Sequence, residues 1–190
     1  MDIDKKLKVY NVSKELFERF GYRKTTVDEI AAGAGISKRT LYEMFDCKEK
    51  LLSELVIHEA LLFEKLIQRE INLINDPLIK LERFTILSMK YFASNPFLGK
   101  VLSDESGLYA PFLKDEIKTI EEGIEGIFLR ILIEGTQKNI FRNMDHKASA
   151  NCIFILFRSF TYANTLKPNR DWIQFIRNAI INDSISTDLP

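Results

Sequence analysis

The sequence has little of the chemistry that metal sites and disulfide frameworks need, with 2 cysteines and 2 histidines among 190 residues. Cys47 and Cys152 are too few for a zinc site or a disulfide scaffold. His58 and His146 are too far apart to form a His-Glu-x-x-His motif. Gly-x-Ser-x-Gly and phosphate-binding glycine loops are also missing. We therefore predict no metal site and no cofactor, and we do not expect an enzyme.

Long apolar runs and an excess charge of one sign are missing as well. The longest stretch without a charged residue is 148–157, whereas a membrane-spanning helix needs roughly 18 or more apolar residues. No apolar signal segment follows the first residues, so we expect a cytoplasmic protein without a membrane partner. Lys plus Arg and Asp plus Glu number 27 each, and any binding to nucleic acid therefore requires a local basic patch.

Strict alternation of apolar and polar residues, which is typical of strands, does not occur over any long segment. Apolar residues instead repeat every three or four positions between the glycines and prolines, which predicts an all-α fold of about nine helices. The expected helices cover residues 3–20, 27–34, 38–44, 48–75, 77–94, 96–103, 111–141, 146–166 and 169–182.

Two short helices are expected to meet at a tight turn near the N-terminus. Thr26 and Glu29 have the spacing of a capping box at the start of the first helix. Gly35 ends that helix, and Ser37 is a favourable N-cap for the second. This order predicts a helix-turn-helix motif, whose second helix normally lies in the major groove of DNA.

The residues around this motif resemble a known family. The matching segments are LFERFGYRKTTVDEIA (16–31), AGISKRTLY (34–42), Phe45 and KEKLL (48–52). They resemble the DNA-binding segment of the TetR family of transcriptional repressors. The resemblance implies an all-helical homodimer that binds a palindromic DNA operator and releases it when a small molecule enters a pocket in the larger domain.

We predict two domains, a DNA-binding domain at 1–50 and a domain for ligand binding and dimerisation at 51–190. The charge asymmetry is small, since the first 50 residues carry 11 basic and 9 acidic side chains. Their placement matters more, because Lys38 and Arg39 open the expected recognition helix. The helix expected from residue 48 would link the two domains rigidly.

The expected DNA contacts are short polar and cationic groups at the start of the recognition helix, with anchors on the flanking phosphates. The family resemblance implies phosphate contacts from Tyr42 and Lys48, and from one of two adjacent threonines. For Thr26 the capping role alone also explains the residue. The predicted DNA-binding residues are Thr25, Thr26, Ser37, Lys38, Arg39, Thr40, Tyr42 and Lys48.

Two positions depart from the family pattern. Cys47 stands where a capping Ser, Gly, Asn or Asp is usual, and a thiol is a poor acceptor. It is either an inert substitution or a redox switch, because reactive thiols commonly stand beside a cation at a helix N-terminus. Glu43 either accepts a hydrogen bond from a cytosine amine or is a solvated side chain.

The region after residue 50 contains 11 of the 14 phenylalanines and the single tryptophan. Such side chains serve either as ordinary core or as the wall of a cavity. A mostly aromatic and aliphatic lining favours an apolar or amphipathic effector. The candidate pocket residues are Phe84, Leu87, Met89, Tyr91, Phe92, Phe97, Tyr109, Phe112, Phe128 and Phe160.

The last two helices are expected to pair with their symmetry mates in a dimer. Their apolar residues are candidates either for that interface or for the core of the subunit. The candidates are Phe154, Phe157, Trp172, Phe175, Ile176 and Ile180. Two alternatives stay open at this point: a helical ligand- or protein-binding module whose DNA-binding head is vestigial, and a regulator without an effector.

Overall fold

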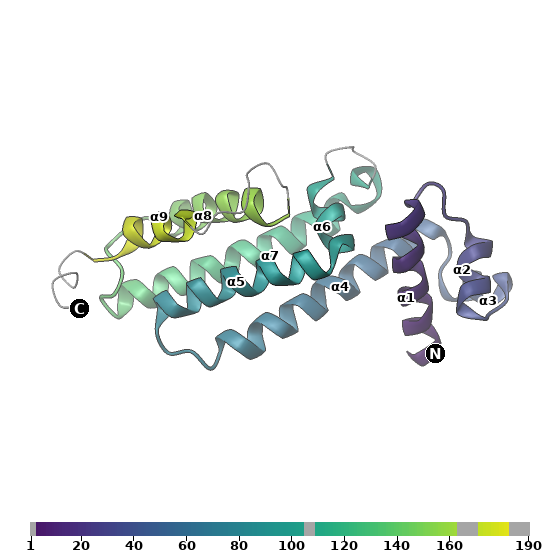
Figure 1. The fold of residues 1–190 in the computed structure, drawn as a ribbon, viewed down its shortest axis with the longest axis horizontal. Coiled ribbons are helices and arrows are strands. Elements are labelled where there is room, and N and C mark those ends of the chain that lie inside the picture. Colours follow the sequence, from purple (N-terminus) through teal and green to yellow (C-terminus); the bar gives the residue numbers. More distant parts are fainter. Residues whose placement is uncertain (1–2, 105–108, 163–170, 183–190) are drawn as a thin grey trace.

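The computed structural model describes residues 3–104, 109–162 and 171–182. Within these ranges the chain forms nine α-helices, and the first three form a head at one end of an elongated molecule (Figure 1). No helix of this part of the chain is long and apolar enough to span a membrane. The helices are α1 (Ile3–Phe20), α2 (Val27–Ala34), α3 (Lys38–Met44), α4 (Lys48–Ile71), α5 (Pro77–Ser94), α6 (Pro96–Ser103), α7 (Ala110–Gln137), α8 (His146–Thr161) and α9 (Asp171–Ile180).

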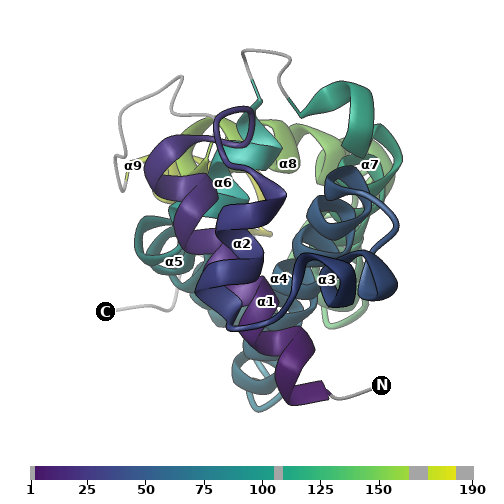
Figure 2. The ribbon, with the colours of Figure 1, turned by 90° about the vertical axis from the view of Figure 1, so that its right-hand side faces the viewer.

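The head consists of α1, α2 and α3, and Figure 2 shows it end-on. Helix α1 repeats its buried residues at helical spacing, with Val9 and Phe17 among them, and packs along α2. Ile30 from α2 and Leu41 from α3 complete this small core, each at most 2% exposed. Burying such a side chain stabilises a fold by about 1.5–3 kcal/mol. The head therefore has a core that fixes the orientation of α3.

The body is a bundle in which α7 packs against α4, α5 and α8. Helix α4 starts in the head and continues along the body, as Figure 1 shows. Three fully buried rings form the centre of the bundle: Phe84 lies edge-on to Phe128, with 4.9 Å between ring centroids, and stacks on Phe157 at 5.5 Å. The domain boundary at residue 50 falls in the first turn of α4 and stays a prediction.

Helix starts agree closely with the sequence predictions, and four helix ends differ. Helix α4 ends at Ile71 instead of residue 75, and α7 at Gln137 instead of residue 141. After α7, Asn139 has a left-handed φ of 57°, which Asn tolerates better than most residues. The next residues then pair with the end of α9 through the antiparallel bridge between Phe141 and Ile181.

The last two expected helices are also shorter than predicted. Helix α8 ends at Thr161, and the remainder of its predicted span, residues 163–166, lies outside the described residues. Residues 169–170 of the next predicted helix lie outside them too. Helix α9 ends at Ile180, where its carbonyl oxygen accepts a hydrogen bond from the Arg142 amide at 2.9 Å. This pairing ends the helix before residue 182.

Candidate nucleic-acid interface and effector groove

The turn between α2 and α3 depends on local caps. Gly35 adopts a left-handed conformation, with φ of 68°, and its amide donates to the carbonyl oxygens of Ala31 and Ala32. A residue with a side chain is strained at such a φ, so glycine fits this turn. The Ser37 hydroxyl then accepts a hydrogen bond from the Thr40 amide at 3.0 Å and caps α3. These caps fix where the recognition helix begins.

The predicted capping box of α2 is present. The Thr26 hydroxyl accepts from the Glu29 amide, and the Glu29 carboxylate accepts from the Thr26 amide at 2.7 Å. These hydrogen bonds, from the backbone first and then from the hydroxyl, lower the pKa of Glu29 below its ordinary value of 4.5. Thr26 itself is exposed. Its capping role therefore leaves it at the surface beside α3.

The outer face of α3 presents polar and cationic side chains. Lys38, Arg39 and Tyr42 are exposed, whereas Leu41 is buried against the head. Each cation has an acidic partner: Lys38 Nζ lies 2.9 Å from an oxygen of Asp28, and Arg39 Nε lies 2.9 Å from an oxygen of Glu43. The hydrogen bond from Lys38 to Asp28 raises the pKa of Lys38. Exposed pairs of this kind contribute little to stability, so both cations can exchange partners readily.

Two predicted phosphate contacts are turned inward. Thr25 is 1% exposed, and its hydroxyl donates to the carbonyl oxygen of Gly21 at 3.0 Å. Of the two adjacent threonines, only Thr26 is therefore available at the surface. Lys48 Nζ donates to the carbonyl oxygens of Tyr22 and Thr25 at 3.0 and 2.9 Å. Its Nζ also lies over the Tyr22 ring, 4.3 Å from the centroid, so Lys48 fastens α4 to the head, and its phosphate contact stays a prediction.

Cys47 occupies the N-cap position of α4, where the family resemblance places it. Its sulfur accepts a hydrogen bond from the Lys50 amide at 3.4 Å. The residue is exposed and carries no disulfide. The choice between an inert cap and a redox switch remains a prediction, since the contact fits both.

The head is fastened to the body by polar contacts from α1. Lys14 Nζ lies 2.7 Å from the carboxylate of Glu59 on α4. One turn later on α1, the carboxylate of Glu18 accepts a hydrogen bond from the Phe97 amide at the start of α6. The Tyr22 ring adds contacts with Tyr109, at 6.1 Å between centroids. These contacts join the head to both α4 and α6.

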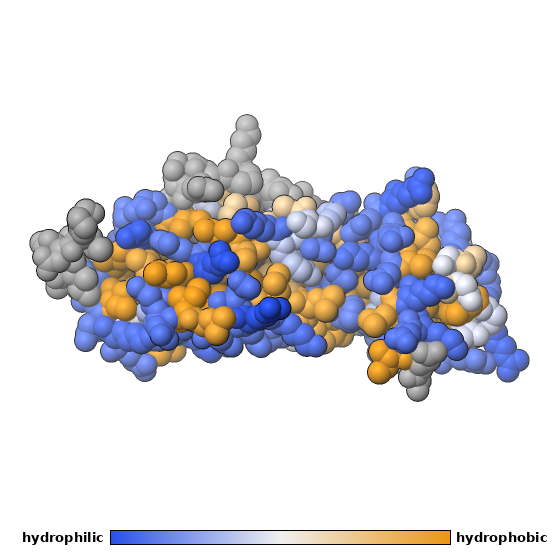
Figure 3. Space-filling view, turned by 60° about the horizontal axis from the view of Figure 1, so that its bottom comes forward, coloured by the Kyte–Doolittle hydropathy of each residue, from blue (hydrophilic) through white to orange (hydrophobic). Residues whose placement is uncertain are grey.

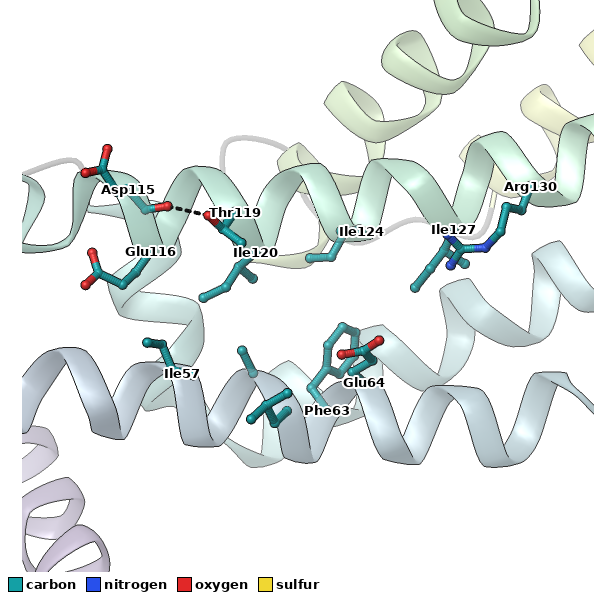
Figure 4. Close-up of a pocket in the computed structure, with 13 residues that line it drawn as sticks. Ile57, Phe63, Glu64, Asp115, Glu116, Thr119, Ile120, Ile124, Ile127 and Arg130 are labelled. Atoms are coloured by element: carbon teal, nitrogen blue, oxygen red, sulfur yellow. Dashed lines mark hydrogen bonds between the residues drawn. The ribbon is translucent and has the colours of Figure 1, made fainter.

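A groove of about 500 Å³ lies between α4 and α7, within the size range typical of ligand pockets. Figure 4 shows Asp115 and Glu116 at one end and Arg130 at the other, with isoleucines between them. Figure 3 shows that apolar side chains also gather on the surface of the body where α4 lies; Ile57, Leu61 and Leu66 are exposed members of this helix. The residues lining the groove are Ile57, Ala60, Leu61, Phe63, Glu64, Asp115, Glu116, Thr119, Ile120, Gly123, Ile124, Ile127 and Arg130.

None of the ten predicted pocket residues lines this groove. Phe84, Phe92, Phe97 and Phe128 are core residues with at most 5% exposure. Their rings contact one another or neighbouring aromatic rings, so they fill the bundle. The other predicted residues lie elsewhere: Leu87, Met89, Tyr91 and Phe160 are half-buried, Tyr109 is buried, and Phe112 is exposed.

The sequence does not predict this groove, because large aromatic residues are the candidates for the pocket lining. The groove instead lies where small residues, Ala60 and Gly123, stand on facing helices. A Cβ placed on Gly123 would meet no atom within 4 Å. Glycines inside a long helical segment are unfavourable for helix stability and are a signal in the sequence, but they do not identify the helix that faces them.

The structure separates the six predicted interface residues into two groups. Phe157 is 0% exposed and so has no surface left for a partner, and Phe154 is 7% exposed. Trp172 on α9 stacks on Phe160 of α8, with 5.2 Å between ring centroids, so it serves the subunit's own core. Ile176 and Ile180 are buried as well. Only Phe175, at 66% exposure, presents a large apolar surface outward.

Comparison with known proteins adds to this geometry. Residues 9–55 match the sequence profile described as "Bacterial regulatory proteins, tetR family". The match spans the three head helices and the start of α4. These residues therefore form a DNA-binding segment of the TetR type. Helices α2 and α3 are therefore a helix-turn-helix of the kind that bacterial regulatory proteins carry.

Other similar proteins match more of the chain than this profile does. The uncharacterized HTH-type transcriptional regulator YxaF of Bacillus subtilis is 26% identical over 136 residues, which cover 69% of this chain and 71% of YxaF. A TetR transcription regulator from Haloarcula marismortui is 15% identical, with a TM-score of 0.78 over 95% of this chain and 100% of its own. FadR from Bacillus subtilis in complex with stearoyl-CoA is 20% identical, with a TM-score of 0.75 over 93% of this chain and 97% of its own. At these identities the solved structures show the fold.

Proposed function

We propose that the protein is a cytoplasmic homodimeric repressor that binds a palindromic operator and releases it when a small apolar or amphipathic molecule enters the α4–α7 groove. The observation that carries this proposal is α4 itself. Its first residue, Lys48, is bonded to the head, and its middle residues, such as Leu61, line the groove. A single rigid helix thus connects the DNA-binding element with the candidate effector site.

The mechanism follows from the geometry of two-site binding. A ligand that separates α4 from α7 shifts the head through Lys48 and the Lys14–Glu59 pair. Two recognition helices must meet half-sites about 34 Å apart, so a small shift in their separation breaks one set of contacts. A coupling free energy of about 1–3 kcal/mol changes DNA affinity roughly 5- to 150-fold.

DNA upstream of the protein's own gene provides the test, with binding measured by fluorescence anisotropy at several salt concentrations. Replacing Arg39→Ala or Tyr42→Ala is expected to weaken binding by about 1–3 kcal/mol if the residue reads a base. If the residue contacts a phosphate instead, the slope of the logarithm of DNA affinity against the logarithm of salt concentration should become shallower by about one. Lys118→Ala on α7 is the control, because Lys118 is exposed and pairs only with Glu122 at 3.8 Å. Unchanged binding by both head variants would remove these residues from the DNA site.

One observation favours the alternative of a ligand- or protein-binding module with a vestigial head. Both cations at the start of α3 already face acids, Asp28 and Glu43. A head that neutralises its own cations would bind DNA weakly. Absence of binding to any duplex, together with retained ligand binding by the body, would support this alternative.

A further inference from the structure

The groove between α4 and α7 carries an excess of negative charge in a chain whose total charge is zero. Three of its lining residues, Glu64, Asp115 and Glu116, are acidic, and one, Arg130, is basic. The basic residues nearest in sequence to the acidic end, Lys114 and Lys118, are not part of the lining. The formal charge of the lining is therefore −2.

The charges are separated along the groove. Asp115 and Glu116 lie together at one end, and Arg130 lies at the other end with Glu64 on the facing helix (Figure 4). Along α7, Asp115 and Arg130 are separated by about 22 Å at 1.5 Å per residue. The end that contains Asp115 therefore carries two negative charges without a lining cation beside them.

The two carboxylates differ in their contacts. The Ser53 hydroxyl donates a 2.5 Å hydrogen bond to Glu116 and so orients its carboxylate from the α4 side. The Asp115 carboxylate has no hydrogen bond or ion pair within the described residues. A pair of adjacent carboxylates, one held in place and one without a partner, is complementary to a cationic group.

The space between the charged ends is apolar. Ile120, Ile124 and Ile127 follow one another along α7, and Ile57 and Leu61 face them from α4. Gly123 leaves open space at the middle of this surface. An extended hydrocarbon chain would bury its surface there, at roughly 25 cal/mol per Å² removed from water.

We propose that the effector of this groove is a cationic amphiphile, with an amine head against Asp115 and Glu116 and an apolar tail along the isoleucines of α7. This inference rests on the proposed function, because it names the class of molecule that the groove receives. An anionic head would meet like charges at the acidic end, which is unfavourable, and in the reversed orientation it would meet Arg130 together with the acidic Glu64 on the facing helix (Figure 4). The groove therefore differs in expected ligand from FadR of Bacillus subtilis, whose structure contains stearoyl-CoA.

Dodecylamine and dodecanoate share one tail and carry opposite charges, so they isolate the effect of the head. Binding of each to the full-length protein is measured by calorimetry at neutral pH, below the concentration at which either aggregates. We expect dodecylamine to bind at least tenfold more tightly, which corresponds to about 1.4 kcal/mol. Equal affinity, tighter binding of dodecanoate, or binding of neither compound would overturn the inference.

Three variants locate the binding. The double variant Asp115→Asn with Glu116→Gln keeps the side-chain volumes and is expected to abolish the preference for the amine. Glu122→Gln is the matched control, since Glu122 lies on α7 outside the lining. Gly123→Leu adds a side chain in open space and is expected to block the groove while improving helix propensity. Retained amine binding by Gly123→Leu, or a preference unchanged in the double variant, would place the amine elsewhere and contradict the proposal.

Measuring DNA affinity in the presence of each compound distinguishes failure of this inference from failure of the proposed function. If dodecylamine binds with the expected preference but leaves DNA affinity unchanged, the ligand class stands and the release mechanism fails. If dodecanoate releases the DNA and dodecylamine does not, the release mechanism stands and the ligand class fails.

Discussion

Lys14 on α1 and Glu59 on α4 form an ion pair of 2.7 Å whose carboxylate is almost completely enclosed, with 6% of the Glu59 side chain exposed. Asn95 is a second acceptor for Lys14 at 3.3 Å. The pair joins the head to α4 at the residue that precedes Ala60 in the groove lining. It is therefore both a stabilising contact and part of the connection between the groove and the head.

Replacing Glu59→Gln is expected to lower the free energy of unfolding by about 2 kcal/mol, because Lys14 loses its charged partner while remaining partly enclosed. Urea denaturation of the purified protein measures this. The exposed pair between Lys118 and Glu122 is the control, and Glu122→Gln should change stability by less than about 0.5 kcal/mol. Equal effects of the two substitutions would show that burial of the Lys14–Glu59 pair has no energetic importance.

The capping box of α2 predicts a pH dependence. The lowered pKa of Glu29 means that its contribution to stability is complete above the ordinary value of 4.5 and is lost as the pH falls through the lower, folded-state value. The difference in unfolding free energy between wild type and Glu29→Gln should therefore shrink as the solution is acidified below pH 4.5. A difference that stays constant across this range would exclude the carboxylate from the cap.

Thr26→Ala removes the other half of the box and is expected to destabilise the protein by about 1 kcal/mol. Thr119→Ala is a suitable control, since the Thr119 hydroxyl donates only to the carbonyl oxygen of Asp115 within its own helix. Thermal unfolding followed by circular dichroism compares the two. Equal losses of stability would contradict a specific capping role for Thr26.

Two glycines of α7 predict opposite effects of one substitution. A Cβ on Gly123 meets open space, so Gly123→Ala should raise stability by about 0.5–1 kcal/mol through helix propensity. A Cβ on Gly135 would overlap the Phe141 ring, so Gly135→Ala should lower stability by about 1–3 kcal/mol. Denaturation of both variants under identical conditions tests the packing of Phe141 on α7, and a gain from both substitutions would refute it.

The acids beside the recognition helix predict stronger DNA binding when they are neutralised. Asp28→Asn removes the ion-pair partner of Lys38, and Glu43→Gln removes that of Arg39. Each should increase DNA affinity by about 0.5–1 kcal/mol, roughly two- to fivefold, if the cation contacts DNA. Anisotropy titrations with the same duplex measure the change, with Glu122→Gln as a control for net charge. Weaker binding by Glu43→Gln would instead indicate that Glu43 accepts a hydrogen bond from a base.

Helix ends that depend on residues adjacent in the sequence are predicted better than helix ends that depend on packing between distant segments. Thr26, Gly35 and Ser37 are local signals, and α2 and α3 begin where these residues predict. The end of α7 depends instead on the contact of Phe141 with Gly135 and on pairing with α9, which no local pattern encodes.

The sequence does not predict the position of the groove, for a similar reason. The phenylalanine pattern is compatible with both core and cavity, and Phe84, Phe128 and Phe157 turn out to pack on one another. A hollow forms where two helices face each other through small residues, and the facing of α4 and α7 is known only from the fold.

The proposed dimer makes a prediction at Ile155, which lies on α8 and is 54% exposed. Ile155→Ser is expected to weaken self-association by roughly tenfold or more, because burial of such a side chain contributes about 1.5–3 kcal/mol. Ile79 on α5 is a matched control with 52% exposure, and Ile79→Ser should leave self-association unchanged. Sedimentation equilibrium measures both variants, with circular dichroism as a check that each remains helical. A dimer disrupted by Ile79→Ser and not by Ile155→Ser would move the interface from α8 and α9 to the face that contains α5.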